Sequence, residues 1–385
     1  MTFKRAIFWT HLAVGIVFGI VVVFMSATGV LLTYERQIET RAVNSAVQAP
    51  ANTSPLDIDG LVAKAEENGA LAGHSVVVSS TEGAAVKVSK SRRESFLMNP
   101  YTGEQMKGAG EDTKSFFRTV MLLHRWFALS GEGRDIGKAI TGASNLAFLF
   151  LLASGFYLWW PKKWKWSFIR QNLLFRRNLP TSKARDYNWH HVFGIWALVP
   201  LLAVVISGVV ISYPWASDLV VAIYGEADPA RPGQSADAVP QGQGAGGGQT
   251  VSFQSIFNGL RAEVPDWTAM TFKLPQDNAK RLVVTVDTGN GAQLSRQRTF
   301  TLSRVSGEQL GVVEPEDQSA GRRARVFLRF LHTGEVYGVV GQTLAGLASL
   351  AALFLGYTGF TLAYRRLVQP LFRRRRAGHA SNDAR

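Results

Sequence analysis

The sequence predicts a membrane α-helical protein, with four transmembrane helices arranged as a duplicated pair and two small water-facing α+β domains. Three observations predict this fold class: four long apolar stretches, a repeat that relates these stretches in pairs, and two long intervals of mixed composition between them. Charged residues make up 18% of the 385 residues and apolar residues 46%. That balance indicates a mixture of membrane spans and water-facing domains.

Each of the four apolar stretches is long enough to cross a membrane. They cover residues 7–34, 137–160, 189–213 and 338–364, and each exceeds the roughly 20 residues that span a hydrocarbon core. The first stretch is too long for a cleavable signal peptide, and it takes part in the repeat described below. We therefore expect it to be retained as a transmembrane helix.

Positive charge is concentrated in segments 161–186 and 365–385, and the formal net charge is +14. Lys and Arg mark cytoplasmic loops, so we expect both termini and the 161–186 loop on the cytoplasmic side. This topology predicts a multi-pass membrane protein with both long intervals on the outer side. The basic charge thus indicates topology and contact with the lipid bilayer, and not nucleic-acid binding.

The two long intervals are expected on the periplasmic side as small α+β domains. In each, a capped amphipathic helix (residues 54–69 and 252–265) precedes three short strands. The strands are expected at 74–80, 84–91, 94–100, 269–274, 280–287 and 297–304. The full organisation is transmembrane helix 1 at 7–34, periplasmic domain 1 at 35–118, an outer histidine segment with transmembrane helix 2 at 119–160, a cytoplasmic basic loop at 161–186, transmembrane helix 3 at 187–213, periplasmic domain 2 at 214–325 with a Gly-rich loop at 229–249, an outer histidine segment with transmembrane helix 4 at 326–364, and a cytoplasmic basic tail at 365–385.

The sequence contains an internal repeat, in which the first apolar stretch matches the third and the second matches the fourth. The segment HLAVGIVFGIVVVFMSATGVLLTY from His11 aligns without a gap with HHVFGIWALVPLLAVVISGVVISY from His190. The second and fourth stretches end in LASGFYLWWPKK and LGYTGFTLAYRR, and each is preceded by a histidine and a Gly/Glu break, in LLHRWFALSGEG and FLHTGEVYG. Internal repeats in membrane proteins often place the working site between the two halves.

Histidine supplies the candidate metal ligands, because the absence of cysteine excludes thiolate zinc sites, Cys₄ iron–sulfur clusters and disulfides. Three histidines lie at the cytoplasmic ends of spans one and three, and two precede spans two and four on the periplasmic side. A helix of about 23 residues rises roughly 34 Å, so most of a bilayer separates the two groups. The five are His11, His190 and His191 inside and His124 and His332 outside, whereas we interpret His74 and His379 as surface residues.

A pair of histidines in each layer favours axial ligation of two b-type haems, since two imidazoles fill both axial positions of the iron. A zinc site would require three or four converging ligands. Ordinary interfacial histidines and a proton relay remain alternatives. His190 aligns with His11 in the repeat and is the preferred inner ligand, with His191 as the alternative.

Arginines lie close to the outer histidines in the sequence. Because Arg pairs well with carboxylates, Arg125 and Arg329 are candidates to bind haem propionates, with Arg134 and Arg323 nearby. Contact with lipid headgroups explains the same residues equally well. Gly131 and Gly133, and likewise Gly334 and Gly338, are expected to break the helices beside the outer haem.

The motifs LHR…GEGR…GFYLWWP and LHTGEVYG…TGFTLAYRR, together with HxxxG on spans one and three, resemble those of the PepSY-associated transmembrane family. The resemblance covers nearly the whole chain, and the periplasmic α+β units resemble PepSY domains. Members similar to this chain include inner-membrane ferric-siderophore reductases, which implies a location in the bacterial inner membrane. The resemblance implies haem ligands at His11, His124, His190 and His332, a ferric siderophore as periplasmic substrate, and a separate cytoplasmic electron donor such as a flavoprotein.

The sequence therefore predicts a haem-dependent oxidoreductase that passes electrons across the inner membrane to reduce ferric siderophore iron. Two alternatives stay open: a PepSY-type binding or regulatory protein of a periplasmic peptidase, and a haem electron carrier to quinone or another acceptor. A transporter is disfavoured, because the four spans hold few polar residues at mid-membrane depth.

Overall fold

The computed structural model describes residues 2–91, 94–161, 165–225, 250–276 and 279–372. It divides into two compact units, which we describe one at a time. The membrane unit comprises residues 1–34, 117–217 and 331–385, and the sheet unit comprises residues 35–116 and 218–330. The Gly-rich loop expected at 229–249, His379 and much of the basic tail lie outside the described residues.

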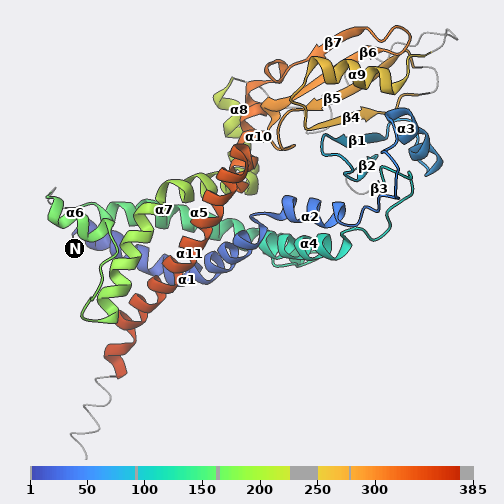
Figure 1. Ribbon diagram of the computed structural model, residues 1–385. Coiled ribbons are helices and arrows are strands. Elements are labelled where there is room, and N and C mark those ends of the chain that lie inside the picture. Colours follow the sequence, from blue (N-terminus) through green and yellow to red (C-terminus); the bar gives the residue numbers. More distant parts are fainter. Residues whose placement is uncertain (1, 92–93, 162–164, 226–249, 277–278, 373–385) are drawn as a thin grey trace, which may run out of the picture. The chain divides into compact units, whose positions relative to one another are not determined.

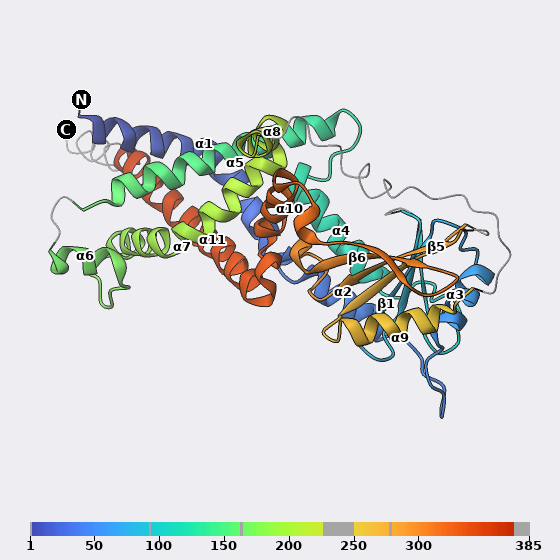
Figure 2. The ribbon, with the colours of Figure 1, turned by 90° about the horizontal axis from the view of Figure 1, so that it is seen from above.

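Four helices of the described chain are long and apolar enough to cross a membrane, so the protein is a multi-pass membrane protein. Within the membrane unit they are α1 (Phe3–Leu32), α5 (Gly133–Trp159), α7 (Ser182–Ser212) and α11 (Gly338–Leu367). Both α1 and α7 pack against α5 and α11, which makes a four-helix bundle with α1 and α7 on one diagonal (Figures 1 and 2).

The middle of the bundle is filled with aliphatic side chains. Its centre includes Leu152 of α5, Leu201 and Val205 of α7, and Ala348 and Ala352 of α11. Small residues such as these alanines let helix backbones approach closely where the hydrophobic effect does not drive association. This aliphatic layer occupies α5, α7 and α11 between the two ends of the bundle.

Helices α4 (Glu111–Trp126) and α10 (Ala320–Thr333) lead into α5 and α11 through tight corners. The first corner forms at Phe127 and Ala128, which both have a φ of 56° and whose amides bond back to the carbonyls of Leu123 and Leu122. These nested bonds, with both residues in the left-handed region, close the C-terminal end of α4. Helix α4 therefore ends before Gly131 and Gly133, where the sequence predicted the break.

Glycine makes room for the backbone at both corners. A Cβ atom on Gly137 would collide with the carbonyl of Trp126, and Gly334 and Gly341 approach each other in the same way at the second corner. In the first corner Thr141 also donates to the Arg125 carbonyl, at 2.9 Å. The ends of α4 and α10 are thereby held against the starts of the spanning helices α5 and α11.

The sheet unit is built on a seven-stranded antiparallel sheet in the order β3-β2-β1-β4-β5-β6-β7. The strands are β1 (Ser75–Ser79), β2 (Val86–Ser89), β3 (Ser95–Met98), β4 (Ala269–Lys273), β5 (Arg281–Asp287), β6 (Gln297–Ser303) and β7 (Gln309–Val313). The six strands predicted from the sequence are present, and β7 is an addition. Alternate residues such as Val76, Val88, Phe272 and Val284 point into one core.

Helices α3 (Ile58–Glu67) and α9 (Phe253–Glu263) pack side by side over this core (Figure 1). Each caps the other. The carboxylate of Asp59 accepts from the amides of Phe253 and Gln254, and the Gln254 side chain accepts from the amide of Ile58. Carboxylates at a helix N-terminus stabilise it by meeting free N–H groups.

The structure has one joint sheet where the sequence predicted two α+β domains. Strand β1 pairs with β4 in a regular antiparallel register from Ser75 opposite Lys273 to Ser79 opposite Ala269. Each half alone has three or four strands and one helix, and pairing at β1 and β4 removes an exposed edge from both halves. The remaining described helices are α2 (Glu35–Asn44), α6 (Trp166–Leu173) and α8 (Pro214–Ile223).

Candidate functional site

Four histidines form two pairs in the membrane unit. His11 and His190 lie near the starts of α1 and α7, at the end of the bundle where α5 and α11 finish, and we call them the terminal pair. His124 and His332 lie in the last turns of α4 and α10, just before the two corners, and we call them the corner pair.

Each of the four histidines contacts a Ser or Thr hydroxyl on a neighbouring helix. The Nδ1 atom of His11 lies 2.8 Å from Ser154 Oγ, and that of His190 lies 2.9 Å from Thr358 Oγ1. In the corner pair, His124 Nδ1 lies 2.8 Å from Thr28 Oγ1. His332 Nδ1 lies 3.4 Å from Ser207 Oγ and 2.8 Å from the Val204 carbonyl oxygen. The same contact thus recurs at positions that the sequence repeat aligns.

The hydroxyl groups determine which ring nitrogen carries the proton. Each hydroxyl lies 2.6 to 3.0 Å from the carbonyl oxygen four residues earlier in its own helix, to which it donates its single proton. It can then only accept from the histidine, so Nδ1 is the protonated nitrogen. The other nitrogen, Nε2, keeps its lone pair and can bind a metal.

A glycine follows each of these hydroxyl residues and leaves room for the imidazole ring. A Cβ atom on Gly155 would lie 3.3 Å from His11 Cε1, and one on Gly208 would lie 3.2 Å from His332 Cε1. The corresponding distances are 3.6 Å for Gly359 and His190, and 3.7 Å for Gly29 and His124. A Cβ atom would therefore crowd the His11 and His332 rings, whereas at Gly359 and Gly29 it would reach only ordinary contact distance from the ring.

The corner histidines lie at a separation that suits two ligands of one metal. Their ring centroids are 6.3 Å apart and their planes are inclined by 58°. A metal–imidazole bond is about 2 Å long and the ring adds about 1 Å on each side, so two imidazoles on opposite sides of one metal have centroids about 6 Å apart. The corner pair fits this arrangement.

Both corner histidines are neutral. Burial, followed by the effect of His332, lowers the pKa of His124 to about 4. Burial also lowers the pKa of His332, and the positive charge of Arg125 lowers the pKa of both. Neutral imidazole is the form that binds metals, so near neutral pH neither ring has to lose a proton first.

The family of this chain follows from a comparison with known protein families. The family described as PepSY-associated TM region matches residues 8–366, which is nearly the whole chain. The chain belongs to this family. No curated protein matches the sequence. All four histidines and their hydroxyl partners lie inside the region that the family covers.

His191 has a different environment from its neighbour His190. Its Nδ1 donates to the Tyr187 carbonyl of its own helix, at 2.9 Å, and its ring lies 4.1 Å from the Tyr187 ring. It has no contact with a hydroxyl of another helix among those that the structure gives. Of the two, His190 shares the arrangement of the other three histidines.

The predicted arginines lie beside aromatic rings. The guanidinium groups of Arg125 and Arg134 lie 4.8 Å and 4.4 Å from the ring centroid of buried Trp126. Arg329 belongs to the sheet unit; it lies on α10, one turn before His332, with its guanidinium 5.5 Å from the Phe330 ring centroid. Arg125 is therefore positioned close to the corner pair, since its charge acts on both histidines.

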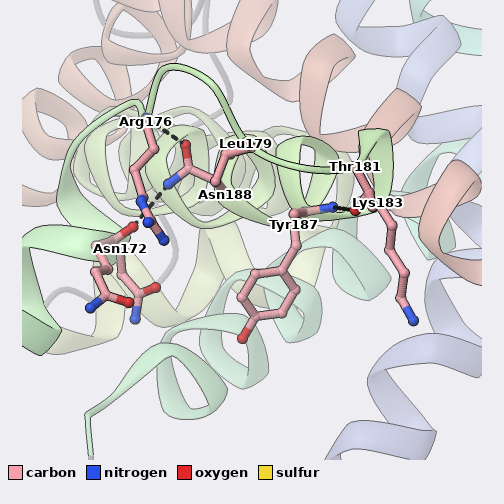
Figure 3. A pocket seen from close by; sticks show the side chains of 9 residues that line it. Asn172, Arg176, Leu179, Thr181, Lys183, Tyr187 and Asn188 are labelled. Carbon is pink, nitrogen blue, oxygen red and sulfur yellow. Dashed lines mark hydrogen bonds between the residues drawn. The ribbon is translucent and has the colours of Figure 1, made fainter.

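A basic cavity opens at the terminal end of α7. It has a volume of about 320 Å³, and its lining includes Arg176, Lys183 and Tyr187, the residue that stacks on His191 (Figure 3). Buried Asn188 shapes one wall, since its side chain accepts from the Arg176 amide and donates to the carbonyls of Gln171 and Leu174. The rings of His191 and His190 are 6.5 Å apart, so aromatic rings connect the cavity to the terminal pair.

A buried carboxylate lies in the same region. Asp186 is fully buried and forms ion pairs with Arg185 of its own helix, at 2.9 Å, and with Arg365 of α11, at 3.0 Å. It thereby ties the start of α7 to the end of α11, the two helices that supply His190 and its partner Thr358. No group of three or more metal-binding side chains (His, Cys, Asp or Glu) occurs among the described residues.

Two features were not found from the sequence. The hydroxyl partners were missed, although the matching Thr-Gly and Ser-Gly pairs in all four spans were the signal that could have identified them. The interpretation of His74 as a surface residue is wrong, because His74 is only 5% exposed and its Nδ1 lies 2.8 Å from the Leu71 carbonyl oxygen.

Proposed function

We propose that the protein is a transmembrane oxidoreductase with two b-type haems, one held by His11 and His190 and the other by His124 and His332. The observation that carries the proposal is the contact between each Nδ1 and a hydroxyl on a neighbouring helix. This contact leaves four Nε2 lone pairs available in two pairs. Metal-binding histidines usually have a second hydrogen bond of this kind.

The surroundings of the histidines suit haem. A glycine beside each ring clears space next to the ligand, and apolar bundle side chains lie between the two pairs. A haem held by two of these histidines would supply reversible one-electron transfer. The chain itself orients the imidazoles, keeps Nδ1 protonated and separates the two sites. His11 and Thr28 are 17 residues apart on α1, which places the two layers about 26 Å apart along the helix.

Electrons are proposed to enter at the terminal end. The Lys and Arg residues near that end favour its placement in the cytoplasm of a bacterial cell, so that the protein lies in the inner membrane with both termini inside. Arg176, Lys183 and Tyr187 line a cavity. The Tyr187 ring contacts the His191 ring, and the His191 ring lies 6.5 Å from the His190 ring. An acidic donor such as a flavoprotein would be attracted to this surface by long-range electrostatics.

The proposed acceptor is a ferric siderophore in the periplasm. One electron reduces the chelated Fe(III) to Fe(II), which oxygen ligands hold more weakly. The support for this substrate is the resemblance to ferric-siderophore reductases, and the position of the corner pair at the other end of the bundle is compatible with it. The chelate would not bind the haem iron directly, because His124 and His332 would hold that iron, so transfer would be outer-sphere.

A second candidate is a binding or regulatory protein of a periplasmic peptidase, which membership of the PepSY-associated family favours. A haem carrier that donates to quinone is a third. Measurements on one preparation of purified protein distinguish the three candidate functions. Detergent-purified protein is examined by absorption spectroscopy, oxidised and then reduced with dithionite, and its haem is counted by the pyridine haemochrome assay.

The haem proposal requires about two haems per chain with low-spin b-type spectra. A folded but colourless preparation overturns it and leaves the regulatory protein. The chemically reduced protein, freed of excess reductant, is then mixed with ferric siderophores and a ferrous trap. Reoxidation with matching ferrous release supports the siderophore reductase, whereas reoxidation by quinone alone makes the protein an electron carrier.

A further inference from the structure

We propose that Thr28, Ser154 and Thr358 are positioning residues that set the electron-donor strength of the axial histidines, and that at the fourth site the Val204 carbonyl, and not the Ser207 hydroxyl, is the main acceptor for His332. The inference rests on the proposed haem function and deepens it. It states which groups of the chain tune the reduction potentials of the two haems, and it predicts that the four hydroxyls are not equivalent.

The three hydroxyls accept a short hydrogen bond from histidine. Their distances to Nδ1 are 2.8 Å for Thr28, 2.8 Å for Ser154 and 2.9 Å for Thr358. Their own protons point elsewhere, since Thr28 donates to the Phe24 carbonyl, Ser154 to Phe150 and Thr358 to Phe354. Each hydroxyl is thus held as an acceptor by its own helix.

An acceptor at Nδ1–H makes the imidazole a stronger ligand. It draws the proton away from the ring, which raises the electron density at Nε2 and the basicity of the ligand. A more basic axial ligand stabilises ferric over ferrous iron and lowers the reduction potential. Loss of the acceptor should therefore raise the potential of the haem that the histidine binds.

His332 has the longest hydroxyl contact of the four, whereas His124 and His190 have backbone hydrogen-bond partners, Met25 and Leu355, in addition to their close hydroxyls. The shortest partner of His332 is the carbonyl oxygen of Val204, at 2.8 Å, whereas Ser207 Oγ lies at 3.4 Å. A carbonyl belongs to the backbone and no substitution removes it. The Ser207 hydroxyl therefore contributes least, and the corner haem depends on a side-chain acceptor chiefly through His124 and Thr28.

The glycines provide a separate, steric test of the same sites. A methyl group on Gly155 would meet His11 Cε1 at 3.3 Å, and one on Gly208 would meet both His332 Cε1 and the Asn145 side-chain nitrogen, at 3.2 Å and 2.9 Å. Alanine at either position should displace the ring and reduce haem occupancy without removing any hydrogen-bonding group. Thr and Ser substitutions change the hydrogen bond and leave this space unaltered.

The experiment uses the full-length protein purified with its haems. The variants are Thr28→Val, Thr358→Val, Ser154→Ala and Ser207→Ala, with Thr28→Ser and Thr358→Ser as conservative versions. Ser349→Ala is the matched control, because this hydroxyl also donates to its own helix carbonyl, at 3.0 Å, and has no histidine partner among the described contacts. The readouts are spectroelectrochemical titration of each haem and the electron paramagnetic resonance signals of the ferric state.

We expect Thr28→Val to raise the potential of one haem, and Ser154→Ala and Thr358→Val to raise that of the other. Each affected haem should stay low-spin with shifted resonance signals. Ser207→Ala and Ser349→Ala should be close to wild type, and the two Thr→Ser variants should restore the wild-type values. If Thr28→Val instead loses its haem while Thr28→Ser keeps it, the hydroxyl is required for ligand orientation and the positioning role stands.

Wild-type potentials and spectra in all three of Thr28→Val, Ser154→Ala and Thr358→Val would overturn the inference while leaving the haem function intact. A shift in Ser207→Ala as large as in Thr28→Val would overturn the assignment of the Val204 carbonyl. A colourless wild-type protein would overturn both this inference and the proposed function, so the two failures are distinguishable.

Discussion

The Nδ1 atom of His124 lies 2.8 Å from the hydroxyl oxygen of Thr28, a residue on another helix and 96 positions earlier in the chain. The two residues belong to helices α4 and α1, and Thr28 itself is 5% exposed. The contact joins one half of a predicted metal site to a span that carries a histidine of the other site. Helix α1 therefore contributes a residue to each of the two sites, His11 to one and Thr28 to the other.

The first prediction concerns the ligands. His11→Ala and His190→Ala should each remove one haem and spare the other, and His124→Ala and His332→Ala should do the reverse, since each haem depends on two imidazoles. Haem content and reduced-minus-oxidised spectra of the purified variants measure this.

His191→Ala is the matched control for His190→Ala, because His191 bonds within its own helix. It should retain both haems. If His191→Ala empties the terminal site while His190→Ala leaves it filled, the ligand has been assigned to the wrong neighbour.

The second prediction concerns stability. Asp186→Ala should destabilise the membrane unit by about 3 kcal/mol, the low end for breaking a buried ion pair, because both partner arginines keep some contact with solvent. Thermal unfolding in detergent measures the change. Asp135→Ala, which breaks an exposed pair with Lys138, should cost less than about 1 kcal/mol. Equal effects would contradict the structural role of Asp186.

The third prediction concerns electron transfer into the terminal site. Arg176→Glu and Lys183→Glu should slow reduction by an acidic flavoprotein and weaken the dependence of that rate on salt, because they reverse charges at the cavity beside Tyr187. Stopped-flow reduction at several ionic strengths tests this. Lys138→Glu, on α5, is the control and should leave the rate unchanged. An unaltered salt dependence in the cavity variants would exclude this surface as the docking site.

The fourth prediction separates outer-sphere transfer from ligand binding. Carbon monoxide should leave the spectrum of the dithionite-reduced protein unchanged, because in the proposed function two histidines would hold each haem iron and leave no position for carbon monoxide. It should also not slow reoxidation by a ferric chelate. A shift of the absorption bands on addition of carbon monoxide would show that one histidine pair does not bind iron from both sides.

The elements with strong periodicity could be predicted from the sequence. The apolar runs are long enough to identify the four spans, and short valine-rich segments between turn residues predicted β1 within 74–80 and β5 within 280–287. Strand β7 was not predicted, because its residues are mostly exposed and do not alternate between buried and exposed positions. The pairing of β1 with β4 could not be predicted from the sequence. Both strands also pair with a strand close in sequence, and local patterns do not reveal a long-range partner.

The histidines could be identified as a set, but their partners could not. A Ser or Thr in a spanning helix usually bonds to its own backbone, so Thr28 and Ser154 looked unremarkable one at a time. Only the packing of α1 on α5 and α4 brings each hydroxyl to its ring. Asp186 was missed for a similar reason, since its partner Arg365 lies at the far end of the chain.

The joint sheet determines the order in which the chain can fold. Asp59 and Phe253, which meet where α3 caps α9, are 194 positions apart, and two membrane spans lie between them. At about 5–20 residues per second, the ribosome needs roughly 10–40 s to supply the second half after the first. During that time the edge of β1 has no partner. The sheet can close only after α5 and α7 have been inserted, so maturation of the water-facing unit is a late event that reports successful membrane integration.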